Sequence, residues 1–137
     1  MLVTDLSAEP TLEEVAEAFA ADKFATEACK CVVLEASKGH AVCEFTIEDV
    51  HRNGFGAVMG GAIFTLADFT LAIACNIDEA PTVSISNTIE YLSSSRGTKL
   101  IAECNVDKSG RKVGFYTVDI KDDLGKSIAR MVATCSR

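Results

Sequence analysis

The apolar residues of this chain recur with two different spacings, and the first of these, near the N-terminus, is that of a helix. The pattern of residues 11–24 predicts a short amphipathic helix that starts near Thr11 or Ser7 and lies on the surface of the main body. Its apolar positions recur at the spacing of one helix face: Leu12, Val15, Ala16 and Phe19.

Alternating apolar and polar residues, typical of half-buried strands, dominate most of the remaining chain. Two runs within residues 29–47 flank a turn-like cluster at 37–40 and predict a hairpin. The other predicted strands cover residues 82–92, 98–107, 112–121 and 126–136. In the first two of these, one parity is apolar: Val83, Ile85, Ile89 and Tyr91, then Leu100, Ala102, Cys104 and Val106. Short turns at 109–111 and 122–125 predict antiparallel hairpins.

Between these strands, residues 60–77 are almost entirely apolar. As a helix this segment would reach about 27 Å, which is close to the thickness of a bilayer core. Asp68 near its midpoint and the strand-like flanks favour instead a helix buried in the core of a water-soluble protein. The order of elements predicts an α+β domain whose antiparallel sheet wraps the helix and hides its whole circumference.

Length and charge narrow the class of protein. The 137 residues suit one domain over residues 1–137, with an N-terminal segment and helix at 1–27. A net charge of −7 disfavours nucleic acid and anionic membranes as partners. The six cysteines form no C-x-x-C pair and predict reduced core residues in a cytoplasmic protein without a metal site. No signal peptide is evident at the N-terminus.

Asp68 is the first candidate for chemistry, because none of its helical neighbours is basic. These neighbours are Phe64, Thr65, Leu71 and Ala72. A carboxylate in such surroundings needs a partner from elsewhere or has a raised pKa, and both are typical of functional sites. The alternative is that Asp68 caps a bend or faces solvent through a gap in the sheet.

The glycine-containing loop before this helix, residues 53–61, is the second candidate. Gly60 and Gly61 at a helix start leave backbone N–H groups open to an oxyanion or a phosphate, although they could also serve only close packing. The spacing matches no nucleotide-binding loop. The serines at 93–95 and the two histidines, His40 and His51, are interpreted as polar loop or turn residues. One carboxylate, one amide and helix N–H donors suit thioester hydrolysis, because a thiolate leaves readily.

The stretch from Asn53 through Gly60 and Gly61 to Asp68 resembles a family signature. It is similar to N-x-x-G-x-x-H-G-G-x-x-x-x-L-x-D of the hotdog-fold acyl-CoA thioesterases, in the PaaI-like and acyl-CoA thioesterase 13 branch. The similarity extends over nearly the full length through the later strands and turns. It implies an antiparallel sheet wrapped around a long central helix, and a homodimer or a dimer of dimers.

The resemblance also implies roles for individual residues in a site shared between two subunits. Asp68 would be the general base or nucleophile of one subunit, while Asn53 and the backbone N–H of Gly60 would come from the other. Ser84 stands where related enzymes have a serine that assists the carboxylate. No metal and no redox cofactor are expected, and coenzyme A enters only as part of the substrate. The expected substrate contacts are Phe55, Met59, Gly61, Arg96 and Arg111, with Arg52, Lys99, Lys112 and Phe64 as further candidates.

One departure from the signature concerns Met59, which replaces the usual histidine. Methionine can neither donate a hydrogen bond nor carry a charge, so turnover should be reduced or the accepted substrate altered. Two alternatives to an acyl-CoA thioesterase therefore stay open: an acyl-CoA or lipid-binding protein without catalysis, and an interaction domain.

Overall fold

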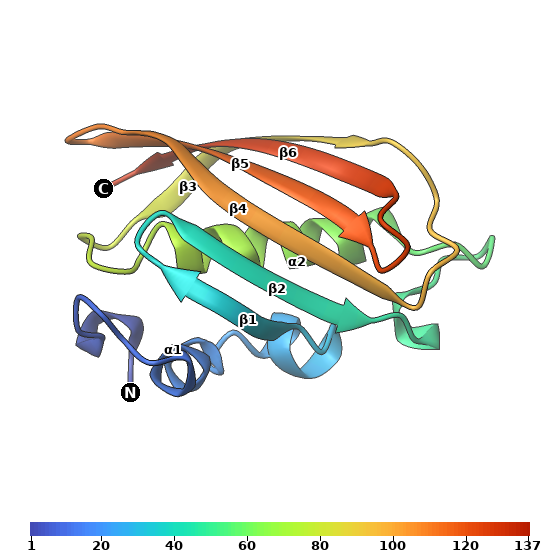
Figure 1. Ribbon diagram of the computed structural model, residues 1–137, viewed down its shortest axis with the longest axis horizontal. Helices are drawn as coiled ribbons and strands as arrows, with labels where there is room; N and C mark the ends of the chain where they lie inside the picture. Colours follow the sequence, from blue (N-terminus) through green and yellow to red (C-terminus); the bar gives the residue numbers. More distant parts are fainter.

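Six strands form a single antiparallel sheet in the computed structural model, which describes residues 1–137 (Figure 1). The strand order across the sheet is β1-β2-β4-β5-β6-β3, so β1 and β3 are the two edges. The four strands predicted with their own limits are confirmed to within two residues at each end. The first hairpin was predicted only as two runs within residues 29–47. The strand bounds are β1 Val32–Ser37, β2 His40–Thr46, β3 Val83–Tyr91, β4 Lys99–Ser109, β5 Val113–Asp122 and β6 Ser127–Ser136.

The turn between β1 and β2 shows why local sequence determines these hairpins. Gly39 has a φ of +75° and a Cβ added there would lie 2.6 Å from Val106 Cγ1, so only glycine fits this tight connection. Its neighbour His40 opens β2 and meets Glu103 of β4 across the sheet, with 3.0 Å between His40 Nε2 and Glu103 Oε2. Turn chemistry and alternation therefore agree here.

The long apolar segment forms α2, Gly60–Ala74, which packs against the concave face of the sheet (Figure 1). It ends before the predicted residue 77 because Asn76 turns the chain. The Asn76 amide donates to the carbonyls of Ala72 and Thr82 and accepts the Thr82 N–H, which ties the end of α2 to the start of β3. None of the helices combines the length and apolarity that crossing a bilayer would require.

The prediction that the sheet hides the whole circumference of α2 is wrong. Nine of its residues are buried, but Gly61 and Asp68 are exposed, and Thr65 and Ala72 are only partly buried. These four residues recur at helical spacing and define the open face of α2. The face stays uncovered because the sheet curls around the large apolar side chains and stops short of this small and polar stripe.

The helix predicted over residues 11–24 ends five residues early, and a separate turn that was not predicted follows it. α1 covers Leu12–Phe19, and a π-helical turn, η2, follows at Phe24–Ala28. Thr11 caps α1 as expected, since its Oγ1 accepts the Glu14 N–H at 3.2 Å. The break after Phe19 lets Phe19 pack edge-on against Phe69 of α2 and lets η2 turn back toward β1. Two short single turns, η1 Val3–Asp5 and η3 Asp49–His51, complete the helical elements.

The parity predicted for the edge strand β3 does not hold along its length. A β-bulge between Ser84 and Ser86 inserts an extra residue relative to β6. Val83 and Ile85 are therefore 67% and 63% exposed, whereas Ser84 and Asn87 are partly buried. In β4, by contrast, Leu100, Ala102 and Cys104 are fully buried as predicted, and only Val106, next to a second bulge, is exposed.

The prediction of six buried, reduced cysteines is confirmed for their burial and pairing state, because all six are free and buried. They belong to one hydrophobic core that includes residues from α1 to β6. The core holds α2 rigidly against the sheet, and both ends of α2 are therefore fixed with respect to the sheet.

Candidate active site

The loop before α2 is held in place by His51, which is buried rather than a polar surface residue. The Glu48 N–H donates to Nδ1 at 2.9 Å, so the neutral ring carries its proton on Nε2 and donates it to the Cys29 carbonyl at 2.7 Å. The ring also stacks on Phe45, with 4.0 Å between centroids. The His51 carbonyl accepts the Met59 N–H at 2.7 Å, which sets the position where α2 begins.

Asn53 organises the loop with its side-chain oxygen. Oδ1 accepts the N–H groups of Phe55 and Ala57 at 2.9 and 3.2 Å, and Arg52 closes the same turn by donating to the Gly56 carbonyl. The Nδ2 group of Asn53 has no partner in the chain. Asn53 is exposed, so this amide donor is available to a ligand.

The start of α2 offers two further donors. The N–H groups of Gly60 and Gly61 form no hydrogen bond within the chain, as expected for a helix N-terminus without a capping side chain. Tyr91 at the end of β3 donates its hydroxyl to the Gly60 carbonyl at 3.0 Å. This bond fixes the helix start against β3, and nothing in the sequence signature pointed to it.

These groups border a depression of about 360 Å³, here called the Gly60 hollow. Its lining combines the loop, the start of α2 and the segment after β3: Asn53, Ala57, Val58, Gly60, Ile63, Tyr91, Leu92, Ser93, Ser94, Ser95 and Ile128. Two of the serines are structural, because Ser93 donates to the Ser127 carbonyl and Ser95 donates to Asp122. The hollow therefore presents amide donors without a base.

Asp68 lies in a separate depression of about 530 Å³, here called the Asp68 hollow, between α2 and η2. Its lining residues are Asp22, Lys23, Phe24, Ala25, Phe64, Thr65, Asp68 and Phe69. Asp68 is exposed, and its carboxylate forms no hydrogen bond and no ion pair within the chain. Desolvation by the surrounding protein raises its pKa, and the negative charge of Asp22 raises it further.

Asp22 was not among the site residues predicted from the sequence. It precedes η2, and burial raises its own pKa as well. Two carboxylates in one hollow disfavour each other's ionised form, which moves Asp68 toward the range of a working general base. Only the break between α1 and η2 brings Asp22 to α2, so no local pattern could have found it.

Ser84 lies partly buried on the inner side of β3, and it is not among the lining residues of either hollow. Its Oγ accepts a hydrogen bond from Nδ2 of Asn87 at 3.1 Å. The bulge at Ser84 and Ser86 allows this contact, because residues three apart in a regular strand point to opposite faces. Ser84 is thus a serine with a defined polar partner.

One chain does not bring the predicted catalytic groups together. Gly60 and Asp68 are eight residues apart on the same rigid helix, which separates them by about 12 Å along its axis. Thioester hydrolysis needs an oxyanion donor within about 3 Å of the reacting centre. The predicted site is therefore divided along α2 into two half-sites: the amide donors at the helix start and the carboxylate of Asp68.

Comparisons with known proteins identify the family. The family model described as thioesterase superfamily matches residues 55–129, more than half of the chain, including all of α2, β3, β4 and β5 and the start of β6. The chain belongs to the thioesterase superfamily. Human acyl-coenzyme A thioesterase 13 is 33% identical over 125 residues, covering 88% of this chain and 89% of that protein.

Solved structures agree with this family assignment. Zebrafish thioesterase superfamily member 2 is similar with a TM-score of 0.82 and 32% identity, covering 92% of this chain and 97% of that one. The Escherichia coli PaaI protein of the phenylacetic acid degradation operon has a TM-score of 0.84 and 26% identity, with 92% of each chain covered. The hotdog fold predicted from the resemblance is confirmed.

The apolar substrate contacts predicted for this thioesterase lie at the rim of the loop. Phe55 is 97% exposed at its tip, and Met59 is 51% exposed beside the helix start. The Cε atom of Met59 would lie 2.8 Å from a Cβ added at Gly61, so the methionine covers the exposed side of that glycine. Phe64 lies apart from them in the Asp68 hollow.

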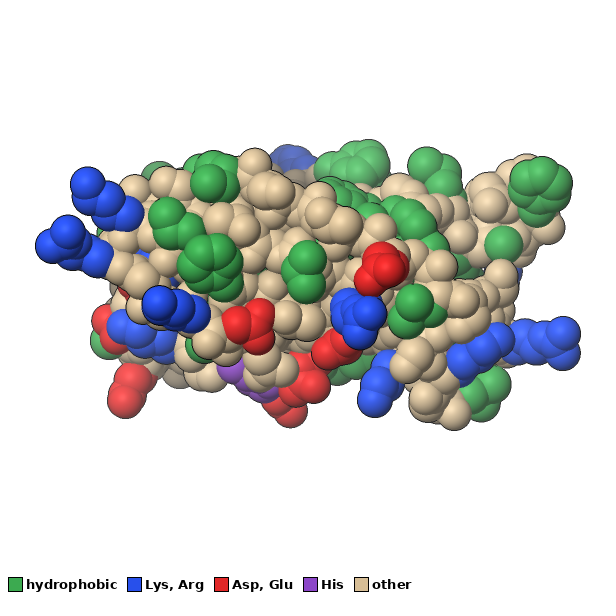
Figure 2. All heavy atoms as spheres, turned by 90° about the horizontal axis from the view of Figure 1, so that it is seen from above, with side chains coloured by type: hydrophobic (Ala, Val, Ile, Leu, Met, Phe, Trp, Pro, Cys, Tyr) green, Lys and Arg blue, Asp and Glu red, His purple; other side chains and the backbone are tan.

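The predicted basic contacts are not brought together within one chain. Arg96 follows the serines of the Gly60 hollow, before β4, whereas Arg111 follows the far end of β4. The eleven residues of β4 separate these positions by about 33 Å. Both arginines are exposed and free of ion pairs, but Lys99 is paired with Glu44 at 3.0 Å. Figure 2 shows Lys and Arg side chains projecting at both ends of the molecule.

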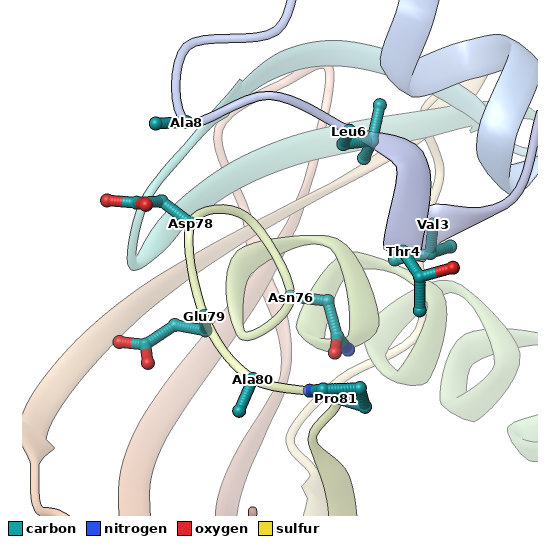
Figure 3. A pocket seen from close by; sticks show the side chains of 9 residues that line it. All are labelled: Val3, Thr4, Leu6, Ala8, Asn76, Asp78, Glu79, Ala80 and Pro81. Carbon is teal, nitrogen blue, oxygen red and sulfur yellow. The ribbon is translucent and has the colours of Figure 1, made fainter.

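A further depression, of about 510 Å³, lies between the N-terminal segment and the loop after α2 (Figure 3). Its acidic residues Asp78 and Glu79 both contact Lys38, and Glu79 also pairs with Arg137. The side chain of Asn76, also in this depression, is hydrogen-bonded to the backbone of Thr82. These polar groups already have partners, so this depression offers no reactive group. No group of three or more His, Cys, Asp or Glu side chains is arranged to hold a metal ion.

Proposed function

We propose that this chain is an acyl-CoA thioesterase that acts as a homodimer, with each active site built from two copies. Family membership supports thioester hydrolysis, and the name of the human relative supports acyl-CoA as the substrate. The position of Asp68 carries the proposal: it is an unpaired and only partly desolvated carboxylate on the open face of a helix whose own amide donors are about 12 Å away.

A two-fold pair of chains removes that separation. If Gly60 of one copy meets Asp68 of a second copy, symmetry requires the reverse contact as well, and the axis then passes near residue 64, midway between them. The open face of α2 suits such an approach because Gly61, Thr65 and Ala72 are small. The unpaired edge of β3, with exposed Val83 and Ile85, lies on the same side of the molecule and can extend the sheet into a second copy. Dimers of this kind can pair further into a dimer of dimers.

The chemistry follows from the two half-sites. Asp68 of one copy takes a proton from water, and the water oxygen forms a bond to the thioester carbon. The Gly60 N–H and Asn53 Nδ2 of the other copy donate to the carbonyl oxygen as it becomes negative. The C–S bond then breaks, the coenzyme A thiolate leaves with its bonding electrons, and it recovers a proton from Asp68. The reaction requires neither a metal ion nor a redox cofactor.

The remaining predicted residues surround this reaction. Ser84 assists the carboxylate, Gly61 contributes a second helix N–H, and Phe55 and Met59 contact the acyl chain at the rim. Arg96 and Arg111 lie at opposite ends of β4, so only one of them from each copy contacts the phosphates of a given coenzyme A, in an acidic protein that otherwise repels them. The free cysteines support a cytoplasmic location, where thiols stay reduced.

Thiol release from short, aromatic and long acyl-CoA substrates tests the activity, and heterodimers test the architecture. In a trans heterodimer one chain carries Asn53→Ala and the other Asp68→Asn. In a cis heterodimer one chain carries both changes and the other is wild type. A two-copy site leaves one of the two sites intact in the trans form, so we expect about half of the wild-type rate, and it leaves none intact in the cis form.

The opposite result, an active cis form and an inactive trans form, would show that each site lies within one chain. Wild-type protein that binds acyl-CoA but releases no thiol from any of these substrates would contradict the proposed activity itself. Asp119→Asn provides a matched control, because Asp119 is an exposed carboxylate on the outer face of β5.

A further inference from the structure

Asn87 is an amide side chain at a position where the alternation of β3 would otherwise favour an apolar residue. It pairs with Ala133 of β6, which is 4% exposed and belongs to the hydrophobic core. The bulge two residues earlier turns both Ser84 and Asn87 toward the inside of the sheet. Bulges commonly redirect side chains next to active sites, so the orientation of this pair calls for a functional explanation.

The hydrogen bonds of Asn87 are asymmetric. Its Nδ2 donates to Ser84 Oγ at 3.1 Å, while its Oδ1 is buried and has no partner. It is the sole buried side-chain nitrogen or oxygen of the chain in that condition. A buried acceptor without a donor destabilises the folded state, and an apolar side chain of similar size would avoid that cost. The chain therefore retains Asn87 at a cost to its stability.

The contact has a direct consequence for the Ser84 hydroxyl. A serine oxygen has two lone pairs and one hydrogen. The Asn87 amide donates to one lone pair of the Ser84 oxygen. The Ser84 hydrogen is therefore free to be donated to a different group. An ionised carboxylate is the strongest kind of acceptor that a hydroxyl can meet in such a site.

Asn87 and Asp68 lie at the same level of the molecule. α2 and β3 run antiparallel (Figure 1). The hydrogen bond from Tyr91 to the Gly60 carbonyl joins the end of β3 to the start of α2. Asp68 is eight helical residues from Gly60, about 12 Å, and Asn87 is four strand residues from Tyr91, about 13 Å. Ser84 Oγ is 3.1 Å from the Asn87 amide, so Asn87 places this hydroxyl toward the level of Asp68, whose carboxylate has no partner in the chain.

An electrostatic contact points the same way. A hydrogen bond with Cys75 lowers the pKa of the Cys135 thiol, and the negative charge of Asp68 opposes that shift. Cys135 is the residue that pairs with Ser84 across the sheet. The charge of Asp68 thus acts on the residue of β6 that lies opposite Ser84.

We propose that Asn87 is a positioning residue that acts through Ser84: it holds the hydroxyl so that its hydrogen is donated to the Asp68 carboxylate and keeps that base aimed at the attacking water. The inference rests on the proposed thioesterase function and extends it. The unpaired Oδ1 accepts a hydrogen bond from a water molecule once the site is assembled.

A double-mutant cycle of Asn87→Leu and Ser84→Ala tests the coupling, with thiol release as the assay. We expect Asn87→Leu alone to lower kcat about tenfold with KM changed less than about twofold, because positioning affects the reacting state rather than substrate binding. In the Ser84→Ala background the same change should alter kcat less than about twofold. The melting temperature of Asn87→Leu should equal or exceed that of the wild type.

Asn87→Ala is measured in parallel, so the test does not depend on how leucine packs at this position. Asn105→Leu is the matched control, because Asn105 is an exposed asparagine on the outer face of β4 and should leave kcat unchanged. An equal loss of kcat in both backgrounds would indicate a structural role and overturn the inference, as would no loss at all. A wild-type protein without thiol release would instead overturn the proposed function, and the inference with it.

Discussion

The two edge strands of the sheet, β1 and β3, differ in whether another element covers them. At the β1 edge, α1 packs alongside the strand, and the start of β1 is tied to η2 by the hydrogen bond from the Cys31 N–H to the Ala25 carbonyl. At the β3 edge no element covers the strand, and Val83 and Ile85 are largely exposed. Both strands carry a bulge, but only that of β3 turns two polar side chains inward.

This difference suggests separate roles for the two edges, one in stability and one in assembly and catalysis. An uncovered strand edge invites pairing with another chain, and proteins usually cover such edges. Here the covered edge completes the core, while the free edge belongs to the strand that contacts α2 and is bonded to its start. The β1 side should therefore govern stability, and the β3 side should govern assembly and catalysis.

The largest effect is expected at Asp68, between the two edges. Asp68→Asn should lower kcat about 10²- to 10⁴-fold, because the general base is lost. The raised pKa of Asp68 means that the folded chain holds its proton more tightly than the unfolded chain, so ionisation destabilises the fold as pH rises above the ordinary carboxyl range. The melting temperature of the variant at neutral pH should thus be unchanged or higher. Asp119→Asn is the control, and near wild-type kcat in Asp68→Asn would remove the base assignment.

The covered edge is tested by Phe19→Ala, which removes the ring that packs on Phe69. Urea unfolding should show a loss of about 3–5 kcal/mol in the free energy of unfolding, while kcat per folded molecule stays the same. Leu12→Ala on the exposed part of α1 should change stability by less than about 0.5 kcal/mol. A large fall of kcat with little change in stability would contradict the division between the edges.

The free edge is tested by an introduced charge. Ile85→Asp brings like charges together when two β3 strands pair, and it should weaken self-association by about a hundredfold and lower thiol release in proportion. Leu34→Asp makes the same change on β1 and should affect neither property. Light scattering and thiol release measure the two outcomes. A monomeric Ile85→Asp protein with full activity would refute the two-copy site.

The Asp68 hollow is tested through Asp22. Removing its negative charge by Asp22→Asn lowers the pKa of Asp68, because like-charge repulsion no longer disfavours ionisation. The acid limb of the kcat/KM profile should therefore move to lower pH, while kcat/KM on the plateau is largely retained. Lys23 is the cation in the same hollow and stays in place. A limb that moves to higher pH, or an equal movement in Asp119→Asn, would contradict this assignment.

The smallest effect is expected at the other half-site. Met59→His adds a donor beside the helix start and should raise kcat about threefold to tenfold, since an additional hydrogen bond can reach the developing oxyanion. The Met59 backbone N–H already donates to His51, so the loop should keep its shape. Leu124→His, on the exposed β5–β6 turn, is the control. A decrease in kcat would show that methionine itself fits the substrate better.

The prediction was close for those elements whose residues show a regular spacing of apolar positions. The strands β4, β5 and β6 and the helix α2 follow from alternation, turn residues and a long apolar run, all of which act between neighbours in the chain. The helix predicted over residues 11–24 ends at Phe19, and η2 was not predicted, because local periodicity does not show where Phe19 must meet Phe69. The resemblance pointed to Asn53, Gly60, Asp68 and Ser84, but it could not show which of them share a hollow.

The sequence by itself determined the order of elements, the antiparallel hairpins, the buried cysteines and an acidic residue on an apolar helix. Tertiary structure alone decided which face of α2 stays open, that His51 is buried under the loop, that Asp22 approaches Asp68, and that the β3 bulge joins Ser84 to Asn87. Periodicity and turn chemistry depend on neighbouring residues and can be recognised along the chain. Hollows, bulges and unpaired groups arise where distant segments meet, and their positions depend on how the whole core packs.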